Sequence, residues 1–188
     1  MKNKTTLNTF ILFCVIVLFS LLFIIFCVPL QNLFVGNSYV EANEIVGLFL
    51  ITGNNQLLDS FTSQEVSHMQ DVRNLIFVAI ALFCGFSSIF LHLKKFDKKI
   101  LLKILLWFDV IVLLCLTFFN VFFTLFHKVL FPQGNYLFSY DSLLIQTYPE
   151  SFFVWMFVFV VGIINLITSI IYLKKNAQKF KKVHGKKK

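Results

Sequence analysis

The fold is decided by a polar, charged run, TSQEVSHMQDVR (residues 62–73), which leads directly into a long apolar segment. Thr62 can cap the N-terminus of a helix, and Glu65 three residues later can accept a hydrogen bond from the capping amide. If the run is helical, Glu65, His68 and Asp71 recur every three residues and share one side of the helix. The sequence therefore predicts a helix that enters a membrane span, with a histidine between two carboxylates just outside it.

The chain is too apolar for a soluble domain. Its mean hydropathy is +0.82, and 58% of its 188 residues are hydrophobic, including 26 phenylalanines. A transmembrane helix needs about 20 mostly apolar residues, and four segments qualify: residues 10–29, 75–93, 100–126 and 152–173. Their apolar runs are continuous rather than alternating, which favours helices over a barrel. We expect an all-α membrane protein, a single membrane domain over residues 1–188 with four transmembrane helices.

Basic residues are divided unequally between the two sides of such a bundle. All but two of the 17 lysines and arginines lie before the first span, between the second span and the start of the third (up to Lys103), or after the fourth. Arg73 and Lys128 are the exceptions, and all but two of the nine acids lie on their side. The positive-inside rule then predicts that both termini are cytoplasmic and that residues 30–74 and 127–151 form outside loops. The net charge of +8 is better explained by anionic membrane lipid than by nucleic acid.

The two outside loops are expected to form a small cap on the membrane domain. Residues 40–51 have the composition of an amphipathic helix that lies along the membrane surface. Gly53-Asn54-Asn55 in the first loop is a turn signal, and Gly134-Asn135 in the second loop is interpreted as a turn. Residues 136–145, in the second loop, are compatible with a short strand or hairpin.

Two of the four histidines are candidates for chemistry. His68 precedes the second span and His127 closes the third, so the topology places both just outside the same membrane surface. His92 and His184 lie among the cytoplasmic lysines and are interpreted as solvated basic residues. Imidazole accepts and donates protons near neutral pH, so a converging pair would suit general acid–base catalysis. The alternative is that each histidine is merely tolerated at the interface.

Two other functions fit parts of this pattern. A metal-dependent membrane hydrolase would need two histidines and one carboxylate, which can be drawn from His68, His127, Glu65 and Asp71. A non-enzymatic transport or assembly subunit would explain Asp109, because ionisable groups inside membranes are often functional. The chain has no HExxH motif. Asn165 lies at a similar depth in the fourth span and is expected to hydrogen-bond to Asp109, with Thr168 or Thr117 as lesser partners. We therefore expect neither a metal nor another cofactor.

Three motifs together resemble one known family. They are Glu65-x-x-His68-Met69-x-Asp71-Val72 before a span, Phe126-His127 at the end of the next, and Tyr148-Pro149-Glu150-x-Phe152-Phe153 before the last. This pattern resembles the lipoprotein intramolecular transacylases, called Lit, and the resemblance covers the four spans, both outside loops and their order.

The resemblance implies a function. Members of that family are multi-pass enzymes of the bacterial plasma membrane that move the sn-2 acyl chain of a diacylglyceryl-cysteine lipoprotein onto the α-amino group of the same cysteine. It implies that diacylated bacterial lipoproteins are the substrate, that the product is a lyso-form lipoprotein, and that the site faces the extracellular side. The family's catalytic pair corresponds to His68 and His127.

Supporting residues surround that pair in the sequence. A carboxylate, from Glu65 or Asp71, can orient the His68 imidazole and raise its basicity. A developing oxyanion would need a hydrogen-bond donor, and the candidates are Arg73, Asn120, Tyr136, Tyr140 and Lys128. The sequence does not divide the acid and base roles between the histidines, and it leaves the oligomeric state open.

Overall fold

Long helices dominate the structure, a computed structural model that describes residues 2–93 and 95–184, with side chains described for residues 3–93 and 95–174. The expected spans correspond to α1 (Lys2–Phe26), α4 (Ser63–Leu93), α5 (Lys98–Thr117) and α8 (Glu150–His184). All four are long and apolar enough to cross a membrane. The prediction of an all-α protein with four spans is therefore confirmed for the described residues.

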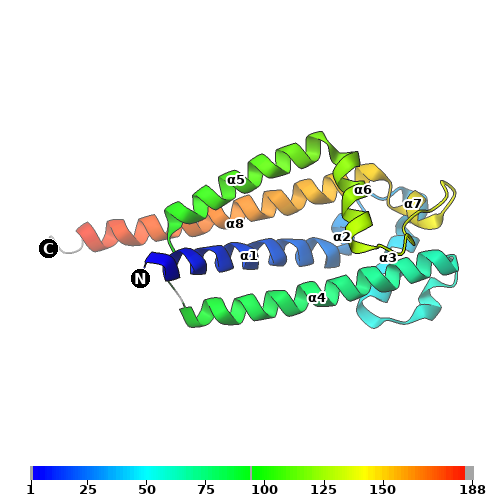
Figure 1. Cartoon of the computed structure of the whole chain (residues 1–188), viewed down its shortest axis with the longest axis horizontal. Helices are drawn as coiled ribbons and strands as arrows, with labels where there is room; N and C mark the ends of the chain where they lie inside the picture. Colours follow the sequence, from blue (N-terminus) through cyan, green and yellow to red (C-terminus); the bar gives the residue numbers. More distant parts are fainter. Residues whose placement is uncertain (1, 94, 185–188) are drawn as a thin grey trace.

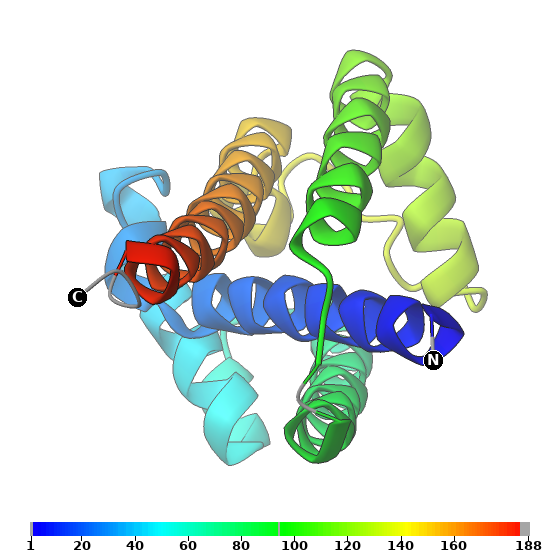
Figure 2. The ribbon, with the colours of Figure 1, turned by 90° about the vertical axis from the view of Figure 1, so that its left-hand side faces the viewer.

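Helix α1 is the centre of the bundle. It packs against α4, α5 and α8, whereas α4 has no comparable contact with α5 or α8. Figure 2 looks along the bundle from the end that holds both chain termini, and it shows α1 crossing between α4 on one side and α5 and α8 on the other. The bundle core combines apolar side chains of α1, α5 and α8, among them Ile16, Ile24, Leu105, Val160 and Ile164. Helix α4 is therefore held to the bundle by one face only.

Helix α4 is longer than a membrane is thick. It begins with the predicted capping box, in which the Thr62 amide donates to Glu65 Oε2 at 2.7 Å and the Glu65 amide donates to Thr62 Oγ1 at 3.3 Å. The helix then continues unbroken for 31 residues, about 46 Å at about 1.5 Å per residue. The hydrocarbon core is only about 30 Å thick. The residues before about Leu75, His68 included, therefore project beyond the membrane-crossing segment.

The third expected span, residues 100–126, is broken, so that prediction was wrong. Helix α5 ends at Thr117, Phe118 adopts φ −114° and ψ 40°, and α6 (Phe119–Leu130) continues in a new direction toward α4 (Figure 1). The Thr117 hydroxyl donates to the Leu113 carbonyl at 2.8 Å, a local bond of the kind that bends helices. Because the 20 residues of α5 already suffice to cross a membrane, the remaining turns are free to change direction.

Short helices form the cap. They are α2 (Val28–Gln31), η1 (Asn37–Tyr39), α3 (Val40–Thr52), η2 (Asn55–Leu58) and α7 (Leu143–Thr147). The predicted helix over residues 40–51 is confirmed as α3, and Gly53, with φ 72°, ends it in the left-handed conformation that the turn signal indicated. The cap has its own apolar core, which joins Val46, Phe49, Leu58, Phe61, Met69 and Leu144.

The strand or hairpin expected over residues 136–145 is not formed. The structure describes this whole segment, which is irregular chain followed by α7. The carbonyls of this loop find side-chain donors instead of a neighbouring strand. Gln64 Nε2 donates to the Leu137 carbonyl at 2.9 Å and approaches the Asn135 carbonyl at 3.5 Å. The loop is thereby fastened to α4, beside the start of the long helix.

Candidate active site

His68 and His127 come from different helices and lie face to face. His68 is on α4, and His127 is in the last turn of α6; their ring centroids are 6.2 Å apart and the ring planes differ by 21°. Since α6 turns toward α4 instead of prolonging α5, the break at Phe118 is what carries His127 to this position (Figure 1). The His68 side chain is only 8% exposed, and His127 is half-buried. The structure therefore brings the two candidate histidines into one site.

Aromatic rings enclose the pair. The ring of Phe131 lies 4.5 Å from that of His68 and 5.7 Å from that of His127, and Phe138 packs edge-on against His68 at 5.4 Å. On the His127 side, Phe123 and Tyr136 lie at 4.2 and 5.2 Å. These rings place the pair in partly apolar surroundings, where charges that develop on the histidines interact more strongly than they would in water.

The tautomer of His127 follows from its backbone contact. Its Nδ1 lies 2.8 Å from the Phe123 carbonyl oxygen, which can only accept, so Nδ1 carries the proton and donates. The neutral ring then has its lone pair on Nε2. Burial lowers the pKa of His127 below its usual value, and the hydrogen bond to Phe123 opposes that shift. His127 is therefore a neutral imidazole with a free Nε2 near neutral pH.

His68 also favours the neutral form. Burial lowers its pKa, the positive charge that His127 can acquire lowers it further, and the side chains of Asn135 and Asp71 act in the opposite direction. The Nδ1 atom of His68 is buried and has no hydrogen-bond partner among the described residues.

Asp71 and Tyr136, two of the supporting residues expected from the sequence, lie close to this pair. Asp71 Oδ2 accepts from Gln133 Nε2 at 2.6 Å and from Asn135 Nδ2 at 2.7 Å, which fixes the loop that follows α6. Tyr136 contacts His127 and is the expected oxyanion donor that lies against the pair.

Glu65 does not have the role expected for it, which was to orient the His68 imidazole. It is 1% exposed and accepts from the Thr62 amide and hydroxyl, from Ser142 Oγ at 2.7 Å and from the Leu144 amide at 2.9 Å. Burial raises the pKa of Glu65, but these hydrogen bonds outweigh it and hold that pKa below the usual value. The carboxylate joins the start of α4 to the N-cap of α7, and none of its hydrogen bonds involves His68.

The remaining expected donors have other surroundings. Arg73 donates to the Leu50 carbonyl at 3.2 Å, and its guanidinium lies 4.6 Å from the Phe77 ring centroid. The amide of Asn120 faces the Glu150 carboxylate, and with its nitrogen turned toward that group Asn120 donates to Oε2 at 3.0 Å. Tyr140 is 96% exposed, and Lys128 is also exposed. None of these four is brought to the histidine rings by a contact within the described structure.

Three residues beside the histidine pair were not expected from the sequence: Asn135, Phe131 and Phe138. Gln133, which ties the loop to Asp71, was not expected either. In the sequence, Gly134-Asn135 indicates a turn and no further role. The one available signal was that this turn follows directly on the segment that carries His127. The metal alternative gains no support, because no group of three or more histidine, cysteine, aspartate or glutamate side chains within the described ranges is placed to hold an ion.

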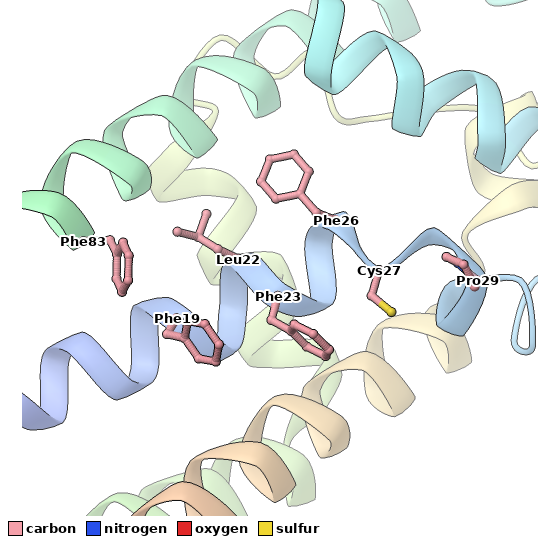
Figure 3. Close-up of a pocket in the computed structure, with 7 residues that line it drawn as sticks. All are labelled: Phe19, Leu22, Phe23, Phe26, Cys27, Pro29 and Phe83. Atoms are coloured by element: carbon pink, nitrogen blue, oxygen red, sulfur yellow. The ribbon is translucent and has the colours of Figure 1, made fainter.

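An apolar groove of about 390 Å³ runs along α1 beside α4. Figure 3 shows its lining, in which the side chain of Phe83 on α4 projects toward α1 and the other residues follow α1 to the start of α2: Phe19, Leu22, Phe23, Phe26, Cys27 and Pro29. Phe83 lies about 22 Å along α4 from His68 at about 1.5 Å per residue. The groove thus extends from the outer end of α1 toward the middle of the spans.

Comparison with known proteins places the chain in context. A family model described as "Lipoprotein intramolecular transacylase Lit" matches residues 6–153. The chain is 30% identical to an uncharacterized protein of Aquifex aeolicus (strain VF5), over 60% of this chain and 57% of that protein. The chain therefore spans little more than half the length of this relative. No solved structure matches the chain.

Proposed function

The chain belongs to the lipoprotein intramolecular transacylase family, and we propose that it moves the sn-2 acyl chain of a diacylglyceryl-cysteine lipoprotein to the α-amino group of the same cysteine. The observation that carries this proposal is the stacked pair of His68 and His127 in an aromatic enclosure beyond the spans. Such a pair can supply both proton transfers that this reaction needs.

The reaction breaks one ester bond and forms one amide bond. The cysteine amine attacks the sn-2 ester carbonyl, loses a proton and gives a tetrahedral intermediate. Its collapse expels the glyceryl oxygen, which takes up a proton to become a secondary alcohol. Nucleophile and ester belong to one substrate, so the enclosure has only to hold them in contact, which removes much of the entropic barrier. No acyl-enzyme is required.

The surroundings of the two imidazoles favour different roles. His127, with Nδ1–H held by the Phe123 carbonyl, offers Nε2 as the base for the amine proton. Both rings start neutral, so the amine proton taken by His127 passes to His68, and the Asp71 carboxylate stabilises the His68 imidazolium. His68 then returns that proton to the glyceryl oxygen, and both rings end neutral. Tyr136, in contact with His127, is the nearest expected donor for the oxyanion.

The membrane supplies the substrate from the side. The acyl chains would lie between the spans, one of them along the α1–α4 groove, while the glyceryl ester stops at the level of the histidines. The family resemblance implies a bacterial plasma membrane location, and the distribution of lysines supports placing this site on the extracellular face.

The test is a reaction in proteoliposomes with a synthetic diacylglyceryl-cysteine lipopeptide. Transfer within one molecule leaves the mass unchanged, so tandem mass spectrometry must locate the acyl chain on nitrogen, with parallel loss of amine reactivity. Release of free fatty acid that stops on chelation would instead support a metal-dependent hydrolase. An unchanged lipopeptide, given folded protein, would contradict the transacylase proposal and leave the non-enzymatic alternative.

A further inference from the structure

We propose that Asn135, held in place by Asp71, is a positioning residue for His68, with Asn135 Oδ1 accepting a hydrogen bond from Nδ1–H of the imidazole. The inference deepens the proposed function and rests on it wherever activity is measured. It concerns a residue of the loop after α6 that the sequence marked only as part of a turn.

The orientation of the Asn135 amide is determined by its nitrogen. Nδ2 donates to Asp71 Oδ2 at 2.7 Å and to Ser67 Oγ at 3.3 Å, and both acceptors are on α4. A second donor, Gln133 Nε2, binds the same Asp71 oxygen at 2.6 Å. With the nitrogen committed to these acceptors, the amide cannot flip, and Oδ1 is left as the free end.

Two buried atoms of opposite kind remain without a hydrogen-bond partner at this place: Nδ1 of His68 and Oδ1 of Asn135. One is a donor when protonated and the other can only accept. The Asn135 side chain lies near enough to the imidazole to favour its protonated form. Buried polar atoms in folded proteins are nearly always paired, and each of these two is the partner that the other lacks.

The bond would give His68 the same tautomer that His127 has. The Phe123 carbonyl holds the proton of His127 on Nδ1, and Asn135 Oδ1 would hold that of His68 on Nδ1. Both rings would then present Nε2 for proton transfer. Asp71 would act through Asn135, in the way that a carboxylate orients the imidazole of an acid–base pair.

The charged and titratable groups around His68 are few. Asp71 faces it from α4 and His127 from α6, while Phe131 and Phe138 cover the remaining sides of the ring. Glu65, on the same helix, is occupied by Thr62, Ser142 and Leu144.

The plain structural alternative is that Asp71 and Asn135 only tether the loop. Gln64 provides a matched control, because it ties the same loop to α4 through the Leu137 carbonyl at 2.9 Å and has no hydrogen bond to Asp71. Gln133 provides a second control, because it shares the Asp71 oxygen but is not the residue proposed to meet His68.

The direct test is ¹⁵N NMR of imidazole-labelled protein in detergent micelles, which reads the histidine tautomer without any substrate. We expect the His68 Nδ1 to be protonated at pH 8 in the unmodified protein, and Asn135→Leu to convert His68 to a mixture of tautomers while His127 stays unchanged. Gln64→Ala should leave both rings unchanged. An Nε2-protonated His68 in the unmodified protein, or no change in Asn135→Leu, would overturn the inference even if the chain proves to have another activity.

Kinetics give the second readout. Asn135→Leu should lower kcat by at least about tenfold with little change in KM, because the loss lies in orientation. Asp71→Asn can keep both hydrogen bonds through its own Oδ1 but removes the charge, so the acid limb of its kcat profile should move to lower pH. Gln64→Ala and Gln133→Ala should stay within about threefold of the unmodified rate. Equal losses in Gln64→Ala and Asn135→Leu would reduce the pair to a loop tether.

Discussion

At the scale of single residues, burial rather than net charge sets the state of the two histidines. His68 and His127 are enclosed by Phe131, Phe123 and Tyr136, and burial lowers the pKa of each below the ordinary value of 6.5. In so basic a chain this is a local effect of the aromatic enclosure. Both rings are therefore available as bases near neutral pH, without any need for a raised external pH.

The pH dependence follows from these directions. We expect the acid limb of the kcat/KM profile to have its midpoint below 6.5, because the rate falls only when the buried imidazoles take up protons. The folded protein also binds fewer protons than the unfolded chain just below that pH, so acidification should lower the free energy of unfolding. Rates from pH 5 to 8, with thermal unfolding in parallel, test this. A midpoint above 6.5 would contradict the dominance of burial.

Removal of either ring has a stronger effect. His68→Ala and His127→Ala should each lower transacylation by about 100- to 10,000-fold, the usual contribution of positioned acid–base catalysis. His92→Ala, at the opposite end of α4, serves as a matched control and should stay close to the unmodified rate. The rates are measured on the same lipopeptide with equal amounts of folded protein. If either outer histidine proves dispensable, the two-histidine mechanism fails.

Only some of the hydrogen bonds of Glu65 could be predicted from the sequence. Its place in the capping box followed from the motif, whereas its bonds to Ser142 and Leu144 depend on a loop far along the chain. Glu65→Ala should lower the free energy of unfolding by roughly 1.5–3 kcal/mol, because it removes a charged acceptor and leaves buried donors unpaired. Since the folded pKa of Glu65 is depressed, this stabilisation exists above the unfolded pKa and is lost as pH falls through the folded value. Thermal unfolding at pH 7 and pH 4 measures both effects, and an equal loss at the two pH values would contradict the role of the charge.

At the scale of elements, the sequence predicted where helices begin and end from local signals, but it did not predict where the chain changes direction. Helix α3, its glycine C-cap and the start of α4 followed from composition and capping residues. The break between α5 and α6 did not, because Phe118 lies in an apolar run without a proline or glycine to mark it. The strand expected near α7 failed for a related reason, since Gln64 satisfies the carbonyls of that loop. The two histidines were found by their position at the ends of spans, whereas Asn135 gained its meaning only from the fold.

The hydrogen bond between Asp109 on α5 and Asn165 on α8 was predicted from the similar depth of the two residues in their spans. Asn165 Nδ2 donates to Asp109 Oδ1 at 3.1 Å, which confirms that pairing. The secondary partners expected for Asp109 were wrong, because Thr117 bonds to Leu113 and Thr168 has no partner among the described side chains.

Asp109 therefore has a structural explanation. Asp109→Ala should cost about 0.6 kcal/mol of stability, typical of such bonds between membrane helices, and should retain most transacylation. Asp109→Asn keeps an acceptor for Asn165 and should be closer still to the unmodified protein. Activity and thermal unfolding of both variants check this. Abolished activity in a normally folded Asp109→Asn protein would favour a proton path.

At the scale of the whole molecule, the two ends of the bundle have opposite characters. The start of α1 and the end of α8 lie together at one end, with the turn between α4 and α5, and the cap with its histidines is at the other (Figure 1). The first end is tied by Asn8 Nδ2, which donates to the Lys95 carbonyl at 3.1 Å, and by Thr9 Oγ1, which accepts from the Asp97 amide at 2.9 Å. Within the described residues, the lysine clusters of the sequence belong to this end. The positive-inside rule therefore predicts that this is the cytoplasmic end.

Cysteine labelling of intact cells tests that orientation. The four native cysteines are free thiols, so they are first replaced by alanine, and single cysteines are then introduced as Tyr140→Cys in the cap loop and Asn176→Cys after the last span. Tyr140 is 96% exposed, and a membrane-impermeant maleimide added outside should label Tyr140→Cys at once. Asn176→Cys should react only after permeabilisation, because moving the flanking lysines across the membrane is strongly disfavoured. Labelling of Asn176→Cys in intact cells would invert or break the four-span topology, and it would leave the histidine pair facing the wrong compartment for lipoproteins presented on the outer side of the membrane.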